Sequence, residues 1–375
     1  MRYISEFRDK EISQKLSKRI FQVVQNYDDE IGLMEVCGTH TNTIFRSGIM
    51  SLLPYNISHL SGPGCPVCVT PNHYLDQAIS YSRLPDVIIA SFGDMIRVPG
   101  STSSLEKEKG RGGDIRVVYS PLESVEFAKK NPGKKVVFLG VGFETTAPLV
   151  ASTIITCREE GLSNLFVLSG HKLIPPAMMA LLESKEVKID GFICPGHVST
   201  IIGKKPYQPL VDNFGIPSVI IGFEPLDLLE GFWMLARQIA NREKPKVEIQ
   251  YKRVVREEGN RRALTLMNEV FEVGDSEWRG LGIVPDSGLF IRDKYSDFDA
   301  DKNIDVEVEP TREHPGCSCG EVLRGVKKPP ECKLFKKVCT PENPIGPCMV
   351  SSEGTCAAYY KYGEMIMNLR GRRVN

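Results

Sequence analysis

Cysteine is concentrated near the C-terminal end of this 375-residue chain, where six of its eleven cysteines lie within forty residues. They are Cys317, Cys319, Cys332, Cys339, Cys348 and Cys356, separated by 1, 12, 6, 8 and 7 residues. A packed core uses cysteine singly, as a small buried apolar residue. Six cysteines in a polar segment rich in proline and glycine therefore predict metal binding or disulfide chemistry.

The spacing of these tail cysteines bears on which metal they would bind. Zinc ribbons use paired C-x₂₋₄-C knuckles, which the tail lacks. Iron–sulfur ligands tolerate irregular spacing because they surround a larger cuboidal core. The spacing therefore favours a [4Fe–4S] cluster over zinc. Either metal needs four ligands, so two cysteines are left over.

A further thiol, Cys37, stands in the segment Cys37-Gly38-Thr39-His40-Thr41, directly after an apolar run. A thiol at a helix N-terminus and near an imidazole has a lowered pKa, which raises its nucleophilicity and its affinity for metals. We expect His40 to hydrogen-bond the sulfur or to share its ligand. The alternative is a buried core cysteine followed by a capping threonine.

Cys65 and Cys68 form the one C-x-x-C motif of the chain. Two thiols at this spacing can close a small disulfide, and a following helix would stabilise the thiolate of the first. Half of a zinc knuckle is the alternative, but structural zinc usually needs two such pairs. The motif therefore favours a dithiol/disulfide couple.

Eight short apolar runs separated by turn residues and helical patterns are predicted as the strands that position these residues. The runs are residues 33–36, 57–60, 86–92, 115–119, 136–141, 165–169, 189–193 and 218–221. Most lack alternation of apolar and polar residues, as expected for strands buried on both faces. Helical patterns lie between them, at residues 72–82, 145–157 and 226–240 among others. This order predicts an α/β fold with parallel sheets.

Reactive side chains follow these strands where each strand ends. They are Cys37, Cys65, Cys68, Asp94, Glu144, His171, Cys194, His197 and Glu224. Ligands of open α/β sheets bind outside the carboxyl ends of the strands, so we expect a site along this edge. The turn Gly140-x-Gly142-x-x-Thr145 also lies there, but it is only a weak match to a nucleotide-binding loop, and a tight turn explains it equally well.

One large sheet or two Rossmann-like halves would account for about eight strands, and we favour two halves split near residues 131–133. The predicted domains are residues 1–130, with Cys37 and the C-x-x-C pair, and residues 131–245. Residues 246–375 form the third part, with a helix at 259–271, a turn-rich linker at 274–316 and the cysteine-rich tail.

Charge and hydropathy limit the function classes. Lys and Arg total 47, as do Asp and Glu, so the formal net charge is zero. Nucleic acids and anionic membranes both require a basic surface, so neither is expected as the main partner. No apolar run approaches the roughly 20 residues that span a bilayer, and the N-terminus lacks a signal-peptide pattern. A cytoplasmic location is therefore expected, where clustered cysteines are metal-binding or redox-active.

Together these residues resemble the HypD family, the maturation proteins of [NiFe]-hydrogenases. The matching stretches are Cys37-Gly-Thr-His40, Gly62-Pro-Gly-Cys65-Pro-Val-Cys68, Ser91-Phe-Gly-Asp94-Met, Gly142-Phe-Glu-Thr-Thr-Ala-Pro148, Gly196-His-Val-Ser199 and the cysteine-rich tail. The match extends through nearly the whole chain. It implies two Rossmann-like domains and a third domain with a [4Fe–4S] cluster, similar in redox logic to ferredoxin:thioredoxin reductase.

The resemblance also implies roles for single residues. The family's cluster ligands follow a C-x14-C-x6-C-x16-C pattern, which selects Cys317, Cys332, Cys339 and Cys356 here. Cys319 and Cys348 would then be a second thiol/disulfide pair beside the cluster. Cys37 would be an iron ligand with His40 nearby, and Cys65 and Cys68 would relay electrons. Asp94 and Glu144 would polarise the site or bind a partner.

Family members work with partners, and this implies a function. With the small protein HypC they hold an iron while carbon monoxide and two cyanides are attached. HypE supplies the cyanide, and the Fe(CN)₂CO unit passes to the hydrogenase large subunit. Our hypothesis is a redox-active assembly scaffold rather than a stand-alone enzyme, with electrons passing from the cluster through the two cysteine pairs to the iron at Cys37. The alternatives are an iron–sulfur oxidoreductase that acts on a protein disulfide and a zinc-stabilised binding module.

Overall fold

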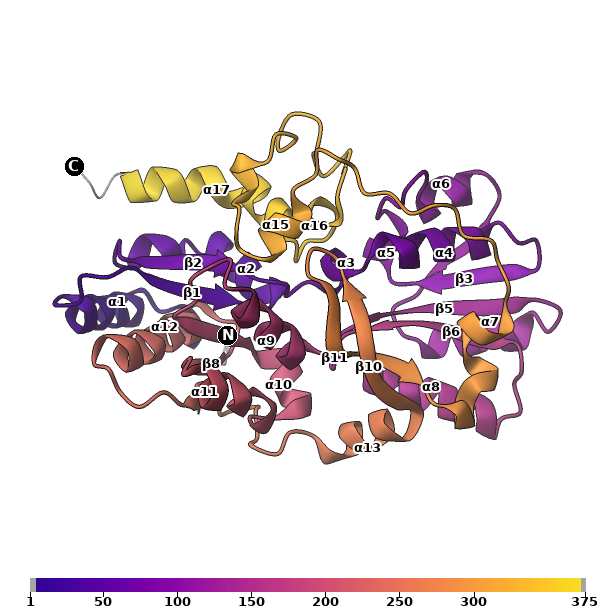
Figure 1. Cartoon of the computed structure of the whole chain (residues 1–375), viewed down its shortest axis with the longest axis horizontal. Coiled ribbons are helices and arrows are strands. Elements are labelled where there is room, and N and C mark those ends of the chain that lie inside the picture. The colour runs from indigo at the N-terminus through magenta and orange to yellow at the C-terminus, as the bar shows by residue number, and fades with distance from the viewer. Residues whose placement is uncertain (1–4, 372–375) are drawn as a thin grey trace.

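The computed structural model describes residues 5–371 and contains two parallel β-sheets, which lie toward opposite ends of the molecule (Figure 1). The first sheet consists of β1 (Ile31–Glu35), β2 (Ile57–Ser61), β7 (Gly191–Pro195), β8 (Ser218–Ile221) and β9 (Val247–Ile249), in the order β2-β1-β7-β8-β9. The second consists of β3 (Val87–Ser91), β4 (Asp114–Val117), β5 (Lys135–Gly142) and β6 (Leu165–His171), in the order β4-β3-β5-β6. The predicted strands are thus all present, and the α/β fold with parallel sheets is confirmed.

The two sheets do not divide the chain at residues 131–133, where we placed a domain boundary. β3 precedes these residues and β5 follows them, yet the two strands pair directly, from Val87 with Lys135 to Ala90 with Phe138. The first sheet in turn takes β1 and β2 from the start of the chain and β7 from beyond residue 190, with Leu33 paired to Gly191. Fully buried parallel strands have the same apolar pattern in either sheet, so the pattern does not tell which sheet a strand joins.

Helices cover both faces of the first sheet. One face packs on α1 (Lys10–Val24), α2 (Gly38–Arg46) and α12 (Pro225–Ala240). The other packs on α9 (Ile174–Ser184), α10 (Gly196–Ile202) and α11 (Gln208–Phe214). The helix α1 begins where the Asp9 carboxylate accepts a hydrogen bond from the backbone N–H of Ile12 at 2.9 Å, and it buries Ile20 and Val24 against the sheet. The sheet is thereby buried on both faces, as its apolar strands require.

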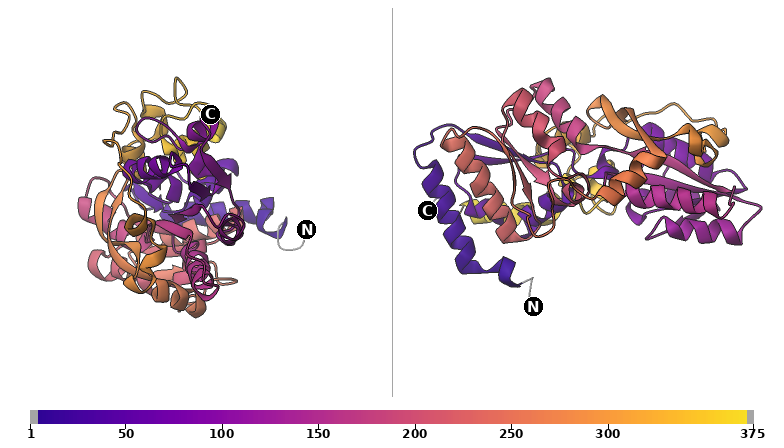
Figure 2. Two further views of the ribbon diagram at one scale, coloured as in Figure 1. Left: turned by 90° about the vertical axis from the view of Figure 1, so that its right-hand side faces the viewer. Right: turned by 90° about the horizontal axis from the view of Figure 1, so that it is seen from below.

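The second sheet is covered in the same way. One face packs on α7 (Leu122–Lys130), α8 (Ala147–Glu159) and α13 (Arg261–Val270). The other packs on α4 (Asn72–Ser82), α5 (Gly93–Ile96), α6 (Leu105–Gly110) and α14 (Ala300–Asn303). The helix predicted at 259–271 is thus confirmed as α13. The view from below shows the lobes around the two sheets side by side (Figure 2).

An antiparallel hairpin, β10 (Phe271–Trp278) and β11 (Gly282–Ile291), lies between the two sheets (Figure 1). We predicted a turn-rich linker from residue 274, so this part of the prediction was wrong. The pairing shifts register between Gly274 and Ser276, and half of the β10 residues are solvent-exposed, so no regular alternation marks the strand in the sequence. β11 packs against both α9 and β6, which makes the hairpin a bridge between the two lobes.

The cysteine-rich tail lies over the junction of the two lobes (Figure 1). Its helices are α15 (Cys319–Leu323), α16 (Pro347–Val350) and α17 (Thr355–Gly371). Both α15 and α16 pack against α3 (Pro66–Val69), and α17 packs against α2. The tail therefore touches the two helices that follow β1 and β2. In the part of the chain that the structure describes, no helix has the length and apolar character needed to cross a membrane.

Candidate functional site

Cys37 is the N-cap of α2, at the carboxyl end of β1. Its backbone is extended, and its carbonyl accepts hydrogen bonds from the N–H groups of His40 at 2.9 Å and Thr41 at 3.1 Å, which start the helix. The side chain is 8% exposed, so the thiol lies just beneath the surface. The predicted position at a helix N-terminus is confirmed.

A carboxylate that the sequence analysis did not select lies directly behind Cys37. Glu35 is fully buried in β1, accepts a hydrogen bond from the backbone N–H of Cys37 at 2.8 Å, and also accepts one from the hydroxyl of Thr41. Burial raises the pKa of Glu35 to about 8, against the effect of these hydrogen bonds. A charged residue inside an otherwise apolar run was the signal that could have identified it.

The loop before the C-x-x-C pair packs on the backbone of Cys37. The N–H of Gly38 donates to the carbonyl of Gly64 at 3.0 Å. Cys65 is the N-cap of α3 and forms a disulfide with Cys68, with the Cα atoms 5.2 Å apart. Both cysteines are buried. The structure thus contains the predicted disulfide. Its first cysteine, Cys65, directly follows Gly64, the residue that contacts the Cys37 segment.

His40 does not contact the sulfur of Cys37 in the way we expected. Its Nε2 faces the carbonyl oxygens of Ile221 at 3.1 Å and Gly222 at 3.0 Å, so we assign the proton to this nitrogen. Its Nδ1 has no hydrogen-bond partner among the described residues, and its ring stacks on Phe223 with centroids 4.8 Å apart. Burial lowers the pKa of His40 to about 4, so the imidazole is neutral at physiological pH.

The pKa of Cys37 also differs from the prediction. Burial, followed by the charges of Glu353 and Glu35, raises it to about 12, although backbone N–H groups act in the opposite direction. The helix N-terminus therefore does not make this a free thiolate. A cation that binds the sulfur must displace its proton.

Glu353, in the tail, is a second residue that the sequence analysis missed. Its carboxylate accepts a hydrogen bond from the hydroxyl of Thr39 at 2.8 Å. Burial, and after it the nearby carboxylate of Asp94, raises the pKa of Glu353. Asp94 lies in the first turn of the short helix α5, just after β3, so the second lobe approaches the tail at Glu353. Spacing alone could not connect Glu353 with residues about 300 positions away.

Glu144 follows β5 and is buried where the two lobes meet. One of its carboxylate oxygens accepts a hydrogen bond from the N–H of Ile174 at 3.0 Å, and the other has no partner among the described residues. Burial raises the pKa of Glu144 to about 7. The buried hydroxyl of Tyr207 lies within electrostatic range of Cys194, Glu144 and Cys37, and burial raises the pKa of Tyr207 well above its usual value. Glu144 and Cys37 therefore have Tyr207 as a common neighbour.

Three other residues at the strand ends form packing contacts or an ion pair within the fold. His171 is buried against Phe271, and burial lowers its pKa to about 3. His197 stacks on Phe223, on which His40 also stacks. Glu224 pairs with Arg8 at 2.8 Å. In the turn after β5, the side chain of Thr146 occupies the space beside Gly142, as in a tight turn of the chain on itself.

The four predicted cluster ligands line one cavity in the tail. Cys317, Cys332, Cys339 and Cys356 surround it together with Cys319 and the apolar side chains of Val322, Leu334, Phe335 and Met349. The N–H of Ile345 points at the sulfur of Cys339 at 3.4 Å, as suits a thiolate. No three His, Cys, Asp or Glu side chains of residues 5–364 converge closely enough for a single metal ion. A cuboidal cluster needs more widely spaced sulfurs, so the donor set suits a cluster better than one ion.

Of the two remaining tail cysteines, Cys319 lines this cavity and Cys348 lies next to Cys319. The thiol of Cys319 lies within hydrogen-bonding range of Cys317, Cys348 and Cys356, and no disulfide joins them. Cys319 begins α15 and Cys348 lies on α16, the two helices that pack against the Cys65–Cys68 helix α3. The predicted second pair is therefore adjacent in space, as two free thiols.

Comparison with known proteins places this arrangement in a family. Residues 11–363 match the HypD family, described as the hydrogenase formation hypA family. The chain belongs to the HypD family. It is 48% identical over 371 residues to hydrogenase maturation factor HypD2 of Bradyrhizobium diazoefficiens, with 97% of each chain covered. It is 48% identical over 370 residues to hydrogenase expression/formation protein HupD of Azotobacter chroococcum mcd 1, with 97% of each chain covered.

A third relative, hydrogenase maturation factor HypD of Cupriavidus necator, is 45% identical over 371 residues, again with 97% of each chain covered. Coverage of this extent includes both lobes and the tail. The resemblance drawn from the motifs is thereby confirmed at the level of the HypD family.

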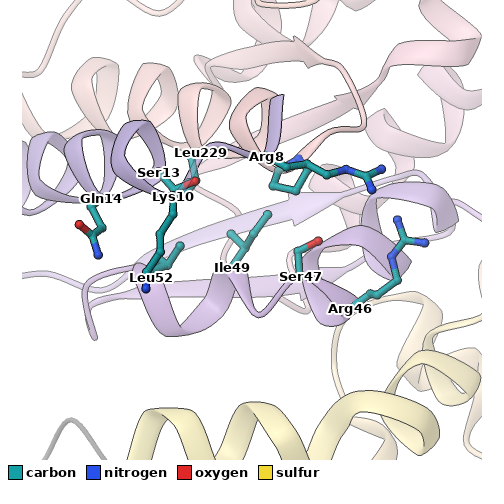
Figure 3. A pocket seen from close by; sticks show the side chains of 10 residues that line it. Arg8, Lys10, Ser13, Gln14, Arg46, Ser47, Ile49, Leu52 and Leu229 are labelled. Carbon is teal, nitrogen blue, oxygen red and sulfur yellow. The ribbon is translucent and has the colours of Figure 1, made fainter. Parts of the chain in front are cut away.

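Figure 3 shows an open groove of this HypD-family chain, and no cysteine lines it. It has a volume of about 470 Å³ between α1, the end of α2 and the start of α12. Arg8, Lys10 and Arg46 line it over an apolar floor that includes Ile49 and Leu229, and none of its lining residues is acidic. Arg46 is the last residue of α2, whereas Cys37 caps its first turn, so the groove opens at the opposite end of that helix.

Proposed function

We propose that this chain acts in [NiFe]-hydrogenase maturation as a redox-active scaffold that holds iron at Cys37 while its cyanide and carbonyl ligands are attached. The names of the relatives support a role in hydrogenase maturation, since they are called a hydrogenase maturation factor and a hydrogenase expression/formation protein. The observation that carries the proposal is the packing of a disulfide helix, α3, between the Cys37 turn and the tail thiols on α15 and α16.

Iron is the cargo of this scaffold, and Cys37 is its proposed ligand. A soft thiolate suits the low-spin iron(II) that cyanide and carbon monoxide favour. The Cys37 thiol loses its proton when it binds iron, so the retention of iron should depend on pH. His40 presents an unprotonated Nδ1, without a partner among the described residues, on the same first turn of α2. It would orient the iron or one of its ligands.

In the tail, Cys317, Cys332, Cys339 and Cys356 would hold a [4Fe–4S] cluster. Such a cluster supplies electrons one at a time when bound. The protein's own contribution is an apolar cavity wall that excludes water and the Ile345 N–H that stabilises a thiolate at Cys339. Cys319 would be the thiol that shares this cavity without being a ligand.

The two cysteine pairs would exchange electrons by thiol–disulfide chemistry. A thiolate of the Cys319/Cys348 pair attacks one sulfur of the Cys65–Cys68 disulfide, and the S–S bond of that disulfide breaks as a mixed disulfide forms. The second tail thiolate then attacks the tail sulfur of this mixed disulfide and displaces the thiolate of Cys65 or Cys68. In sum, Cys319 and Cys348 lose two electrons and two protons, and Cys65 and Cys68 gain them. The reduced pair would then lie next to the iron-binding turn.

Partners among the maturation proteins are part of the proposal. HypC would complete the iron site, HypE would supply the cyanide, and the finished Fe(CN)₂CO unit would pass to the hydrogenase large subunit. Thr39 and Asp94 are both half-exposed and both act on Glu353, which supports an approach of the partner from the junction of the two lobes.

Infrared spectroscopy of the anaerobically purified complex with HypC tests the proposal. Wild-type protein should contain iron with cyanide and carbonyl bands, and Cys37→Ala should lack these bands while its tail absorbance is unchanged. Cys157→Ala, a change of a buried cysteine of α8, is the matched control and should keep the bands. Wild-type protein without iron–cyanide bands, or simultaneous loss of bands and tail absorbance in Cys37→Ala, would contradict it.

The second candidate function is reduction of a disulfide in another protein. It would use the same Cys65–Cys68 pair on α3. Cys65 and Cys68 are only 3% and 0% exposed, so a protein substrate would reach them only after local opening. Turnover of a disulfide substrate without iron–cyanide would favour this function. Metal analysis of the same sample decides between iron–sulfur and a zinc-stabilised binding module.

A further inference from the structure

A short turn, residues 351–354, connects two cysteines of the tail and is packed against one of them. It follows α16, which carries Cys348, and precedes α17, which carries Cys356. The N–H of Gly354 donates to the carbonyl of Ser351 at 2.9 Å, which closes the turn. A Cβ on Gly354 would lie 2.2 Å from the carbonyl oxygen of Cys348. Gly354 therefore packs directly on the backbone of Cys348.

The same turn holds the first turn of α2. Thr39 donates its hydroxyl hydrogen to the Glu353 carboxylate at 2.8 Å, and the Asn42 amide donates to the carbonyl of Ser352 at 3.2 Å. A Cβ on Gly38 would lie 2.3 Å from the Cβ of Glu353, so the two segments are in direct contact. The residue that follows Cys37 is thus packed on the tail.

The second lobe meets the tail at the same place. The Arg97 guanidinium donates to the carbonyl of Val350, the residue before the turn, at 3.1 Å. The carboxylate of Asp94 acts on Glu353 through its charge. Glu353 is therefore the point at which the tail, the Cys37 helix and the end of β3 come together.

We propose that Glu353 is a positioning residue that couples the tail thiols to Cys37 through the turn at 351–354. The significance of Cys37 rests on the proposed function, but the coupling itself does not require iron. The Glu353 carboxylate holds the first turn of α2 closed over the Cys37 thiol by its bond to Thr39. A change in the bonding of Cys348 moves the turn, and the hydrogen bond passes that movement to the Cys37 segment.

Alkylation of Cys37 by iodoacetamide in the full chain, at one fixed pH and followed by peptide mass spectrometry, tests the first part. Glu353→Ala should alkylate about tenfold faster than wild type, the effect of one lost hydrogen bond to a charged group. Thr39→Val should act similarly, and the double variant should show no further increase because both changes remove the same bond. Glu353→Gln keeps an acceptor oxygen for Thr39 but loses the charge that raises the pKa of Cys37, so it should alkylate faster than wild type and more slowly than Glu353→Ala.

Glu342→Ala is the matched control, since Glu342 is an exposed glutamate of the same tail. Its alkylation rate should equal that of wild type. Cys157 and Cys194 are fully buried and report unfolding, because a variant that fails to fold would alkylate at these cysteines as well. An unchanged Cys37 rate in folded Glu353→Ala, or additive effects of the two changes, would overturn the positioning role.

The coupling is tested by changing Cys348 in two backgrounds. Cys348→Ser should alter the Cys37 alkylation rate in the wild-type chain and should have no effect in Glu353→Ala. A purely structural role for Glu353 predicts the same effect of Cys348→Ser in both backgrounds, and that result would refute the coupling. Failure of the proposed function is separate: a wild-type protein that holds no iron–cyanide but shows this alkylation pattern would refute only the iron scaffold.

Discussion

The backbone N–H of Gly38 donates a hydrogen bond to the carbonyl oxygen of Gly64 at 3.0 Å, and this bond joins the Cys37 turn to the loop before the Cys65–Cys68 disulfide. A Cβ on Gly64 would lie 2.0 Å from the backbone nitrogen of Cys37. Real Cβ contacts are never this short, so the loop could not lie here with any other residue. The glycine is what allows Cys37 and the disulfide to be neighbours.

Gly64→Ala should therefore separate these two segments. We expect a loss of about 1–3 kcal/mol in the free energy of unfolding, the usual cost of forcing extra atoms into a packed site, and faster alkylation of Cys37. Urea unfolding measures the first effect. Gly133→Ala is the control, since no atom lies within 4 Å of a Cβ at that position. Equal urea midpoints for the two variants would show that the loop can move aside at little cost.

The sequence allowed the strands, their carboxyl ends and the reactive residues at those ends to be predicted. Uninterrupted apolar runs identify buried parallel strands, and the chemistry follows from where such strands end. The sheet to which each strand belongs could not be predicted, because β3 and β7 carry the same kind of pattern. The Cys37 and Cys65 motifs were found, since each combines a thiol with a strand end.

Contacts between residues far apart in the chain could not be predicted from the sequence. Glu353 reaches Thr39 across 314 positions, and nothing in its neighbours Ser352 and Gly354 indicates the contact. The thiol pKa was predicted in the wrong direction, because a helix N-terminus lowers it while complete burial raises it more strongly. His40 was expected at the sulfur, but its Nε2 donates to the carbonyls at the end of β8, those of Ile221 and Gly222, instead.

The proposal that four tail cysteines are cluster ligands and that Cys319 and Cys348 are not gives a second prediction. Cys332→Ala and Cys339→Ala should each abolish the visible absorbance and the acid-labile sulfide of the anaerobically reconstituted protein, because a [4Fe–4S] cluster needs all four thiolates. Cys348→Ala should keep both signals. Loss of the signals in Cys348→Ala, with retention in Cys332→Ala, would show that the ligand set differs from the one that the resemblance to the HypD family implies.

The packing of α3 against α15 and α16 gives a third prediction, on electron exchange. In Cys68→Ser the Cys65 thiol has lost its partner, so mild oxidation should trap it in a mixed disulfide with Cys319 or Cys348. Digestion under non-reducing conditions and mass spectrometry identify the linked peptides. Cys157 lies in α8 of the other lobe and should not be linked to Cys65. Absence of any link to the tail would rule out direct exchange between the pairs.

Burial of Glu144 gives a fourth prediction, on the pH dependence of stability. The folded protein raises the pKa of this carboxyl from 4.5 to about 7, so between these pH values the folded state holds a proton that the unfolded state has released. The contribution of Glu144 is therefore fully present below about pH 4.5 and is lost as the pH rises through 7. One unit of pKa difference corresponds to about 1.4 kcal/mol, which puts the whole effect on the order of 3 kcal/mol.

Glu144→Gln removes this titration but keeps an oxygen that can accept the hydrogen bond from the Ile174 N–H. The stability of the variant relative to wild type should therefore increase from pH 4.5 to pH 7 and stay constant above that. Urea midpoints at several pH values between 4.5 and 8.5 measure the difference. Glu342→Gln, on the exposed surface, should follow the wild-type profile throughout. A Glu144→Gln profile parallel to that of wild type would contradict the raised pKa. It would mean that water reaches the Glu144 carboxylate in the folded protein through an opening between the two lobes.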